Sequence, residues 1–169
     1  MAQFAAFLRA VNVGGTGMLP MRELRTLCEG LGFNDVQTHI ASGNVVFETN
    51  QPRSKIVAAL QAKLAAHMGK TVGIFVRDAD ELGSIVSADA FPSAGGNRLM
   101  VMLLGDEPQR HMLDAAKNVQ DEQMALGPKC LYVHYPSGMG RSKLKIPGAE
   151  HGTARNMNTI RKVLEMMGG

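Results

Sequence analysis

Cationic and hydroxyl side chains gather between residues 135 and 145, directly after an apolar run that we expect to be a strand. In this loop, Arg141 can bind a phosphate or carboxylate through two parallel hydrogen bonds, while Lys143 offers a compact point charge. Ser142 lies between them, and no Asp or Glu occurs from residue 123 to residue 149. We therefore expect this loop to bind an anion. The alternative is a flexible cationic loop without a ligand.

A second candidate is the loop around Gly14 and Gly15, which follows an apolar stretch and precedes a predicted helix. A strand, a glycine pair and then a helix is a layout that presents backbone N–H groups to a phosphate. The spacing matches neither a dinucleotide fingerprint nor a Walker loop. Within the apolar stretch, Arg9 needs a paired anion or a route to solvent, and Asn12 could orient a ligand. The alternative is a tight turn that only redirects the chain.

Ser42 and Asn44 flank Gly43 in a predicted hairpin turn. Small polar residues at such positions usually serve the turn itself. The functional interpretation is that both side chains form hydrogen bonds with a ligand at the end of the sheet.

A fourth candidate leads into the last predicted helix, where Thr153 or Asn156 is suited to be the N-cap. Free N–H groups and the positive end of the helix dipole favour an anion there. The positive charge of Arg155 opposes this dipole, so we expect Arg155 to have a separate role. We group it with Asn156 and Asn158 as ligand-binding candidates.

Metal, cofactor and paired-acid chemistry find little support in the sequence. No two of the five His and two Cys residues have the spacing of metal ligands, and we expect neither a metal nor a cofactor. Cys130 and His134 would share one face of a strand about 13 Å apart, too far for a catalytic pair. If the protein is an enzyme, we expect His39 or Lys143 to be its proton carrier, and the sequence leaves open whether it is one.

These loops require an α+β framework to position them. Apolar residues alternate in some segments and recur at spacings of three and four in others, which predicts strands and helices respectively. In residues 1–77 the order is strand, helix, strand, strand, helix, strand, the ferredoxin-like or split βαβ arrangement. The expected segments are strands at 3–11, 36–40, 45–47 and 72–76, and helices that begin at Pro20 and Pro52.

A short helix and a linker are expected at residues 78–97, followed by a related half at residues 98–169. The order expected in this half is strand, helix, strand, strand, helix. The second ferredoxin-like half is therefore incomplete and ends before a fourth strand. A single mixed sheet with the helices packed on it is the competing architecture. The expected segments are strands at 99–104, 124–126 and 131–135, and helices at 108–119 and 157–167.

The charge distribution favours an anionic partner. The 169-residue chain has a net charge of +3, but residues 126–169 hold seven Lys or Arg against two Asp or Glu, a net charge of +5. The remaining residues hold 11 against 13, a net charge of −2. Such asymmetry indicates a negatively charged partner, and the alternative is a solvated basic surface that only keeps the protein soluble. We find no export signal and no apolar run of the roughly 20 residues that a membrane span needs, and two cysteines fit a cytoplasmic protein.

The candidate loops belong to longer motifs along the chain. These motifs are Leu8-Arg9-x-x-Asn12-Val13-Gly14-Gly15, Met21-x-x-Leu24, Gly32-Phe33-x-x-Val36-x-Thr38-x-Ile40-x-Ser42-Gly43-Asn44-Val45-x-Phe47, Tyr135-Pro136-x-Gly138-x-Gly140-Arg141-Ser142-Lys143-Leu144 and Thr153-x-Arg155-Asn156-x-Asn158-Thr159. With them the sequence resembles the bacterial domain-of-unknown-function 1697 family, and the resemblance implies an α/β fold without an established activity. The chain departs from many members at residues 145–152, which are shorter than the usual insert, and at Met157, which replaces a common tryptophan.

We expect a protein that binds a phosphate-bearing ligand, either a nucleotide or a nucleic acid. The alternatives are an enzyme that acts on a small anionic metabolite and a purely structural role for the basic and Asn residues. The binding hypothesis makes a geometric prediction. Arg141 and Lys143 should lie within reach of Arg9, Ser42 or Arg155.

Overall fold

The computed structural model describes residues 1–12 and 18–168, which form two compact units with one sheet each. The combination of two antiparallel sheets with five helices confirms the α+β class predicted from the sequence. The first unit comprises Met1–Ala79 and Val163–Gly169, and the second comprises Asp80–Lys162.

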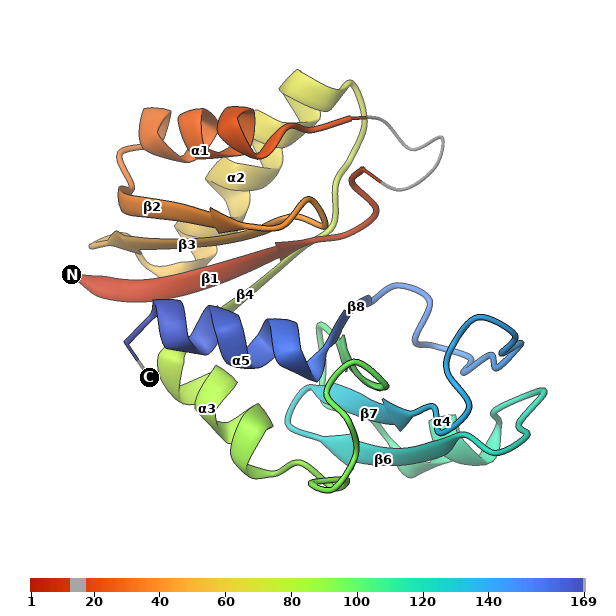
Figure 1. The fold of residues 1–169 in the computed structure, drawn as a ribbon. Coiled ribbons are helices and arrows are strands. Elements are labelled where there is room, and N and C mark those ends of the chain that lie inside the picture. Colours follow the sequence, from red (N-terminus) through yellow and green to blue (C-terminus); the bar gives the residue numbers. More distant parts are fainter. Residues whose placement is uncertain (13–17, 169) are drawn as a thin grey trace. The chain divides into compact units, whose positions relative to one another are not determined.

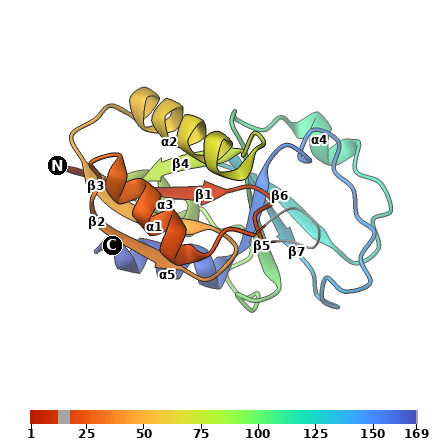
Figure 2. The ribbon, with the colours of Figure 1, turned by 90° about the horizontal axis from the view of Figure 1, so that it is seen from above.

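The first unit contains a four-stranded antiparallel sheet and two helices between its strands. The helices cover one face of the sheet, as Figures 1 and 2 both show. Its strand order is β2-β3-β1-β4, and the chain order βαββαβ is the predicted ferredoxin-like arrangement. Pro20 and Pro52 immediately precede the two helices, where the missing N–H of proline has no hydrogen bond to lose. The elements are β1 (Ala2–Leu8), α1 (Met21–Gly30), β2 (Asn34–His39), β3 (Asn44–Thr49), α2 (Arg53–Met68) and β4 (Ile74–Asp78).

The core of this unit lies between the helices and the sheet. Ile56, Leu60 and Leu64 recur every four residues along α2, and all three are completely buried, as expected for one face of a helix. Near the end of α1, Phe33 stacks on Phe47 of β3 with ring centroids 4.3 Å apart. Each such buried side chain contributes about 1.5–3 kcal/mol. This packing holds the sheet from which the candidate loops emerge.

A second antiparallel sheet, with the order β6-β7-β5-β8, forms the centre of the second unit. This order repeats that of the first sheet, because β5, β6, β7 and β8 take the places of β1, β2, β3 and β4. The prediction that this half ends before a fourth strand is therefore wrong. Residues 153–156 pair with β5 as an edge strand, but their sequence, Thr-Ala-Arg-Asn, lacks the apolar alternation that marks a strand. The remaining elements are α3 (Ala79–Ser87), β5 (Leu99–Leu103), α4 (Arg110–Asp114), β6 (Gln123–Gly127), β7 (Cys130–His134), β8 (Thr153–Asn156) and α5 (Met157–Met166). Only the part of α5 before Val163 belongs to the second unit.

The second unit differs from the first in the connection between its third and fourth strands (Figure 1). In the first unit the 16-residue helix α2 makes this connection, whereas residues 135–152 contain no named helix or strand. Pro136 and Pro147 stand near the two ends of the segment, and proline interrupts helical hydrogen bonding. The ferredoxin-like order of strands is thus present twice. The second copy lacks the helix that would connect its third and fourth strands, which we call the second crossover helix.

Candidate functional site

At one end of the first sheet, the loop that follows β1 meets the turn between β2 and β3. The N–H of Leu8 donates to the carbonyl of Gly43 (2.9 Å), and the N–H of Arg9 donates to the carbonyl of Gly73 (2.8 Å). The end of β1 is thereby held between the turn and the segment before β4, while Arg9 is exposed. Two of the four predicted loops are therefore neighbours within one unit.

Asn12 holds the two sides of the first loop together. Its Nδ2 donates to the carbonyls of Leu19 and Ala41, both at 2.7 Å, and its Oδ1 accepts from the N–H of Leu19 at 2.6 Å. The backbone of Asn12 has a φ of 56°, a left-handed conformation in which asparagine is well tolerated. These bonds use both amide donors, so the side chain serves the loop. The predicted phosphate-binding residues Gly14 and Gly15 lie outside the described residues.

In the β2–β3 turn, the side chain of Asn44 likewise bonds to other residues of the turn. It is 1% exposed, and its Nδ2 donates to the carbonyl of His39 (2.8 Å) and to Oγ of Ser42 (3.0 Å). Gly43, at the centre of the turn, has a φ of 92°, and a Cβ there would lie 2.7 Å from Cγ2 of Val11. The turn therefore packs closely on the end of β1. A ligand-binding role for Ser42 and Asn44 stays a prediction.

The loop at 135–145 contacts the carboxylate of Glu122, which immediately precedes the stretch without Asp or Glu at residues 123–149. The hydroxyl of Ser142 donates to Oε2 of Glu122 (2.5 Å), and the N–H of Gln120 donates to its Oε1 (2.6 Å). These hydrogen bonds, that of Ser142 above all, lower the pKa of the Glu122 carboxyl group. Ser142 is therefore bonded to an ionised carboxylate of the protein itself. Sequence reasoning could not find this contact, because it depends on how β6 pairs with β7.

Arg141 lines a hollow of about 730 Å³ beside this carboxylate. Asp121 lines the same hollow and accepts a hydrogen bond from the hydroxyl of Ser137. Lys143 is exposed, and its carbonyl accepts a hydrogen bond from Nδ2 of Asn118 at 3.2 Å. The hollow therefore contains charges of both signs, which suits a multiply charged anion poorly.

Arg155 lies on β8 with 6% of its surface exposed, and it is not among the residues that line the hollow of Arg141. Its guanidinium donates to Oγ1 of Thr153 (2.7 Å) and to the carbonyl of Ala154 (2.9 Å). Burial lowers the pKa of Arg155 to about 10, so it remains charged at neutral pH. The other expected neighbours of Arg141, Arg9 and Ser42, belong to the first unit.

The start of α5 supports the loop that precedes β5. Asn156 accepts the N–H of Thr159 at 2.8 Å through its Oδ1, as an N-cap residue does. Asn158 lies against Gly96, whose hypothetical Cβ would be 2.0 Å from Oδ1 of Asn158. The predicted capping role of Asn156 is thus present in the structure, and Asn158 packs on Gly96 in the loop before β5.

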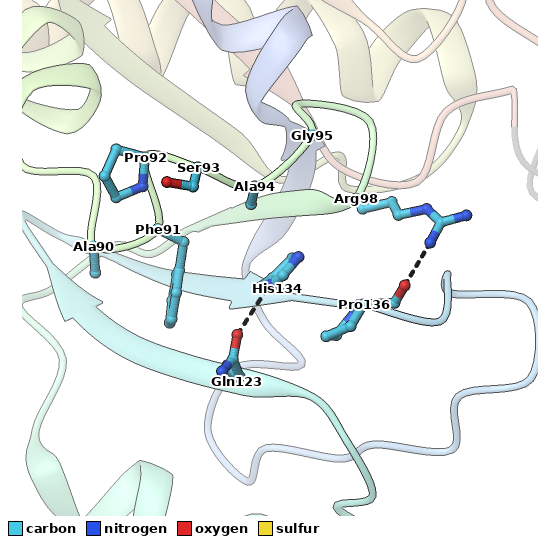
Figure 3. Close-up of a pocket in the computed structure, with 10 residues that line it drawn as sticks. All are labelled: Ala90, Phe91, Pro92, Ser93, Ala94, Gly95, Arg98, Gln123, His134 and Pro136. Carbon is cyan, nitrogen blue, oxygen red and sulfur yellow. Dashed lines mark hydrogen bonds between the residues drawn. The ribbon is translucent and has the colours of Figure 1, made fainter.

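Residues 90–95 and Arg98 form one wall of a second hollow, of about 500 Å³, that the sequence does not reveal (Figure 3). The guanidinium of Arg98 donates to the carbonyl of Pro136, and the ring of Phe91 lies 5.8 Å from that of His134, centroid to centroid. Residues 93–97 look like a linker in the sequence, and His134 is 36 positions from Arg98. The remaining lining residues are Ala90, Pro92, Ser93, Ala94, Gly95 and Gln123.

His134 carries the acid–base chemistry available in this hollow. Its Nδ1 is 2.8 Å from Oε1 of Gln123 (Figure 3). In the neutral tautomer that donates from Nδ1, Nε2 is an acceptor, and in the imidazolium form both nitrogens donate. No lining residue is acidic. The hollow therefore offers a guanidinium, an imidazole and an aromatic ring to an anionic ligand.

Within residues 1–12 and 18–168, no three His, Cys, Asp or Glu side chains are grouped as metal ligands would be. In the same residues, none of the helices is both long and apolar enough to span a bilayer.

Fold and site together define a two-sheet α+β protein with a doubled ferredoxin-like arrangement. The chain belongs to the family described as protein of unknown function (DUF1697), which matches residues 1–132. This confirms the family predicted from the motifs. The match ends before the loop at 135–145 and before β8, so those segments are outside it.

Comparison with other proteins adds the fold alone. The structure of the conserved bacterial protein SP0830 from Streptococcus pneumoniae is similar, with a TM-score of 0.82, 22% sequence identity and 98% of each chain covered. No curated protein matches the chain. Function must therefore be argued from the residues of the sites themselves.

Proposed function

We propose that the second unit binds a nucleotide in the hollow formed by Phe91, Arg98 and His134. The observation that carries the proposal is the grouping of one exposed arginine, one histidine and one aromatic ring in a hollow without an acidic side chain. At about 500 Å³, the hollow has the size of ordinary small-molecule sites, which span roughly 300–1,000 Å³. A cytoplasmic location, which we propose on the basis of two buried free cysteines, would supply such ligands.

The phosphate and the base of a nucleotide each have a matching group in this hollow. Arg98 uses one N–H on the carbonyl of Pro136, and a guanidinium has five donors, so others remain for a phosphate. Protonated His134 would add a second donor and a positive charge. Phe91 offers a ring face for a base, and base–aromatic stacking contributes about 1–3 kcal/mol.

Calorimetric titration with AMP, adenosine and inorganic phosphate tests the proposal. We expect AMP to bind more tightly than either fragment. Arg98→Ala should weaken AMP about tenfold or more, since a hydrogen bond to a charged group contributes about 1.5–3 kcal/mol, and should leave adenosine unchanged. Arg22→Ala removes the same charge from an exposed position on α1 and should change nothing. Failure of AMP to bind, or equal AMP affinity in Arg98→Ala and wild type, would refute the proposal.

A nucleic-acid strand is the alternative ligand for this surface, because Pro136 of this hollow and Ser137 of the hollow with Arg141 are consecutive. A strand that binds both should depend on salt, with a slope of about −0.7 per neutralised phosphate. An oligonucleotide that binds far more tightly than AMP and loses affinity in Arg141→Ala would favour the strand over the nucleotide.

A further inference from the structure

A third hollow, of about 530 Å³, lies in the second unit and shares no lining residue with the other two. Its lining comes from β5, from the segment before β6 and from the irregular segment before β8. The proposed nucleotide site uses none of these residues. They are Met102, Lys117, Leu144, Lys145, Ile146, Pro147, Ala149 and Glu150.

This hollow lies where the second crossover helix is missing. In the first unit, α2 covers the sheet with three completely buried side chains. On the corresponding face of the second sheet, Leu131 and Val133 are buried together with Ile146 from the irregular segment, but Met102 and Leu144 are only partly buried. An irregular segment with two prolines cannot interdigitate with the sheet as a helix face does. Apolar side chains are therefore left to line a hollow.

Two lysines stand opposite each other beside this apolar lining. The N–H of Lys117 donates to the carbonyl of Lys145 (2.8 Å), and the N–H of Lys145 donates to the carbonyl of Lys117 (3.0 Å), which makes an isolated antiparallel bridge. Directly opposed residues of an antiparallel pair project to the same side, and like charges in this arrangement repel. Both side chains are exposed, and within the described residues neither forms an ion pair. An anion between the two ammonium groups would remove the repulsion.

The one carboxylate of the lining is engaged with the backbone. Oε2 of Glu150 accepts the N–H of Gly148 at 2.8 Å. Hydrogen bonds from its own N–H and from that of Gly148 lower the pKa of Glu150. The lining therefore carries two positive charges and one negative charge at neutral pH, together with a largely apolar surface.

We infer that this hollow binds an apolar carboxylate of the fatty-acid kind, with its carboxylate between Lys117 and Lys145 and its chain against Met102, Leu144 and Ile146. The inference rests on two independent features, which are the opposed lysines and the apolar lining left by the missing helix. A carboxylate head satisfies the lysines, and only an apolar chain suits the lining. The inference does not depend on the proposed nucleotide site, because the two hollows share no lining residue.

Calorimetric titration of the full chain with octanoate, octan-1-ol and acetate tests it. Octanoate should bind, and the other two probes should bind at least tenfold more weakly, because each lacks one of the two matching parts. Affinity should rise about fourfold for each methylene added between hexanoate and octanoate, because each buried methylene contributes about 0.8 kcal/mol. The double variant Lys117→Ala with Lys145→Ala keeps the backbone bridge and should lose at least tenfold in octanoate affinity. Lys63→Ala, an exposed lysine on α2, is the matched control.

Several results would overturn the inference. They are a failure of octanoate to bind, equal affinity for octan-1-ol and octanoate, and wild-type octanoate affinity in the double lysine variant. Sedimentation of the free protein gives a further test. A dimer that dissociates in Leu144→Lys, together with no octanoate binding, would assign the hollow to a second copy of the chain.

Discussion

Arg77 on β4 and Arg155 on β8 occupy the same position in the two sheets. Arg77 pairs with Ala5 of β1, and Arg155 pairs with Val101 of β5. Each Nη1 donates to the carbonyl of the preceding residue, at 3.1 Å and 2.9 Å, and the two residues are 5% and 6% exposed. The repeat of strand order therefore extends to one residue with the same local bonding, which favours a structural role for Arg155 in its edge strand.

Removing the Arg155 side chain should destabilise the protein without weakening ligand binding. Arg155→Ala leaves the Thr153 hydroxyl and the Ala154 carbonyl without this donor, at a cost of about 2 kcal/mol or more. For a chain of this size that corresponds to a fall of about 4–8 °C in Tm. Calorimetric unfolding measures it, with Arg22→Ala as the exposed control. An unchanged Tm combined with loss of AMP affinity would instead restore Arg155 as a ligand-binding residue.

The bond between Ser142 and Glu122 predicts a pH-dependent stability. The pKa of Glu122 is lowered in the folded state from its ordinary value of 4.5, so the unfolded state binds the proton more readily. The stabilisation is therefore present above pH 4.5 and is lost as the pH falls through the folded-state pKa. Urea unfolding at pH 7 and at pH 3 should show Ser142→Ala less stable than wild type at the higher pH, with a smaller difference at the lower pH. A difference of the same size at both pH values would contradict this assignment.

Gly43 should not tolerate a side chain. Its φ of 92° and a Cβ position 2.7 Å from Val11 and 3.0 Å from Leu8 combine backbone strain with overpacking, so Gly43→Ala should cost about 2 kcal/mol or more. Gly30 in α1 is the matched control, because a Cβ there meets nothing within 4 Å. Gly30→Ala should be neutral or stabilising by up to about 1 kcal/mol. Denaturant midpoints of the two variants provide the comparison, and equal midpoints would show that the turn can shift.

The contact between Gly96 and Asn158 should govern the shape of the hollow that contains Arg98. Gly96→Ala places a methyl group on Oδ1 of Asn158, which should displace the loop and weaken AMP binding severalfold. Asn158→Ala in the same chain removes the obstacle and should restore most of the affinity, a non-additive result typical of residues in contact. Calorimetric titration of the two single variants and the double variant gives this coupling. Additive losses would mean that the two residues act separately.

Much of the fold could be predicted from hydrophobic periodicity and from the positions of proline. Pro20 and Pro52 precede helices as expected, and the alternation in β2, followed by a turn and the apolar residues of β3, marks a hairpin. The strand β8 could not be predicted, because Arg155 and Asn156 do not look like strand residues. Its pairing with β5 decides its conformation, and such long-range pairing is invisible in a four-residue window.

The sites were predictable only in part. Arg9, Asn12 and Ser42 belong to neighbouring loops, as local strand and turn patterns indicate. The partner of Ser142 could not be predicted, since Glu122 is brought to it by the pairing of β6 with β7. Likewise, Arg98 and His134 share a hollow only because the start of β5 lies beside the end of β7.

The missing crossover helix also determines how the second sheet can open. Residues of α2 protect their amides through a continuous ladder of i to i−4 hydrogen bonds. The segment at 135–152 relies instead on short turns, such as the 2.9 Å bond from Gly138 N–H to the carbonyl of Tyr135, and on the isolated bridge between Lys117 and Lys145. Segments of this kind open locally at far lower free energy than the sheet beneath them. Amide exchange should therefore be fast in this segment and slow in β5 and β7. Such a result would mean that the segment opens locally while the strands of the second sheet stay paired.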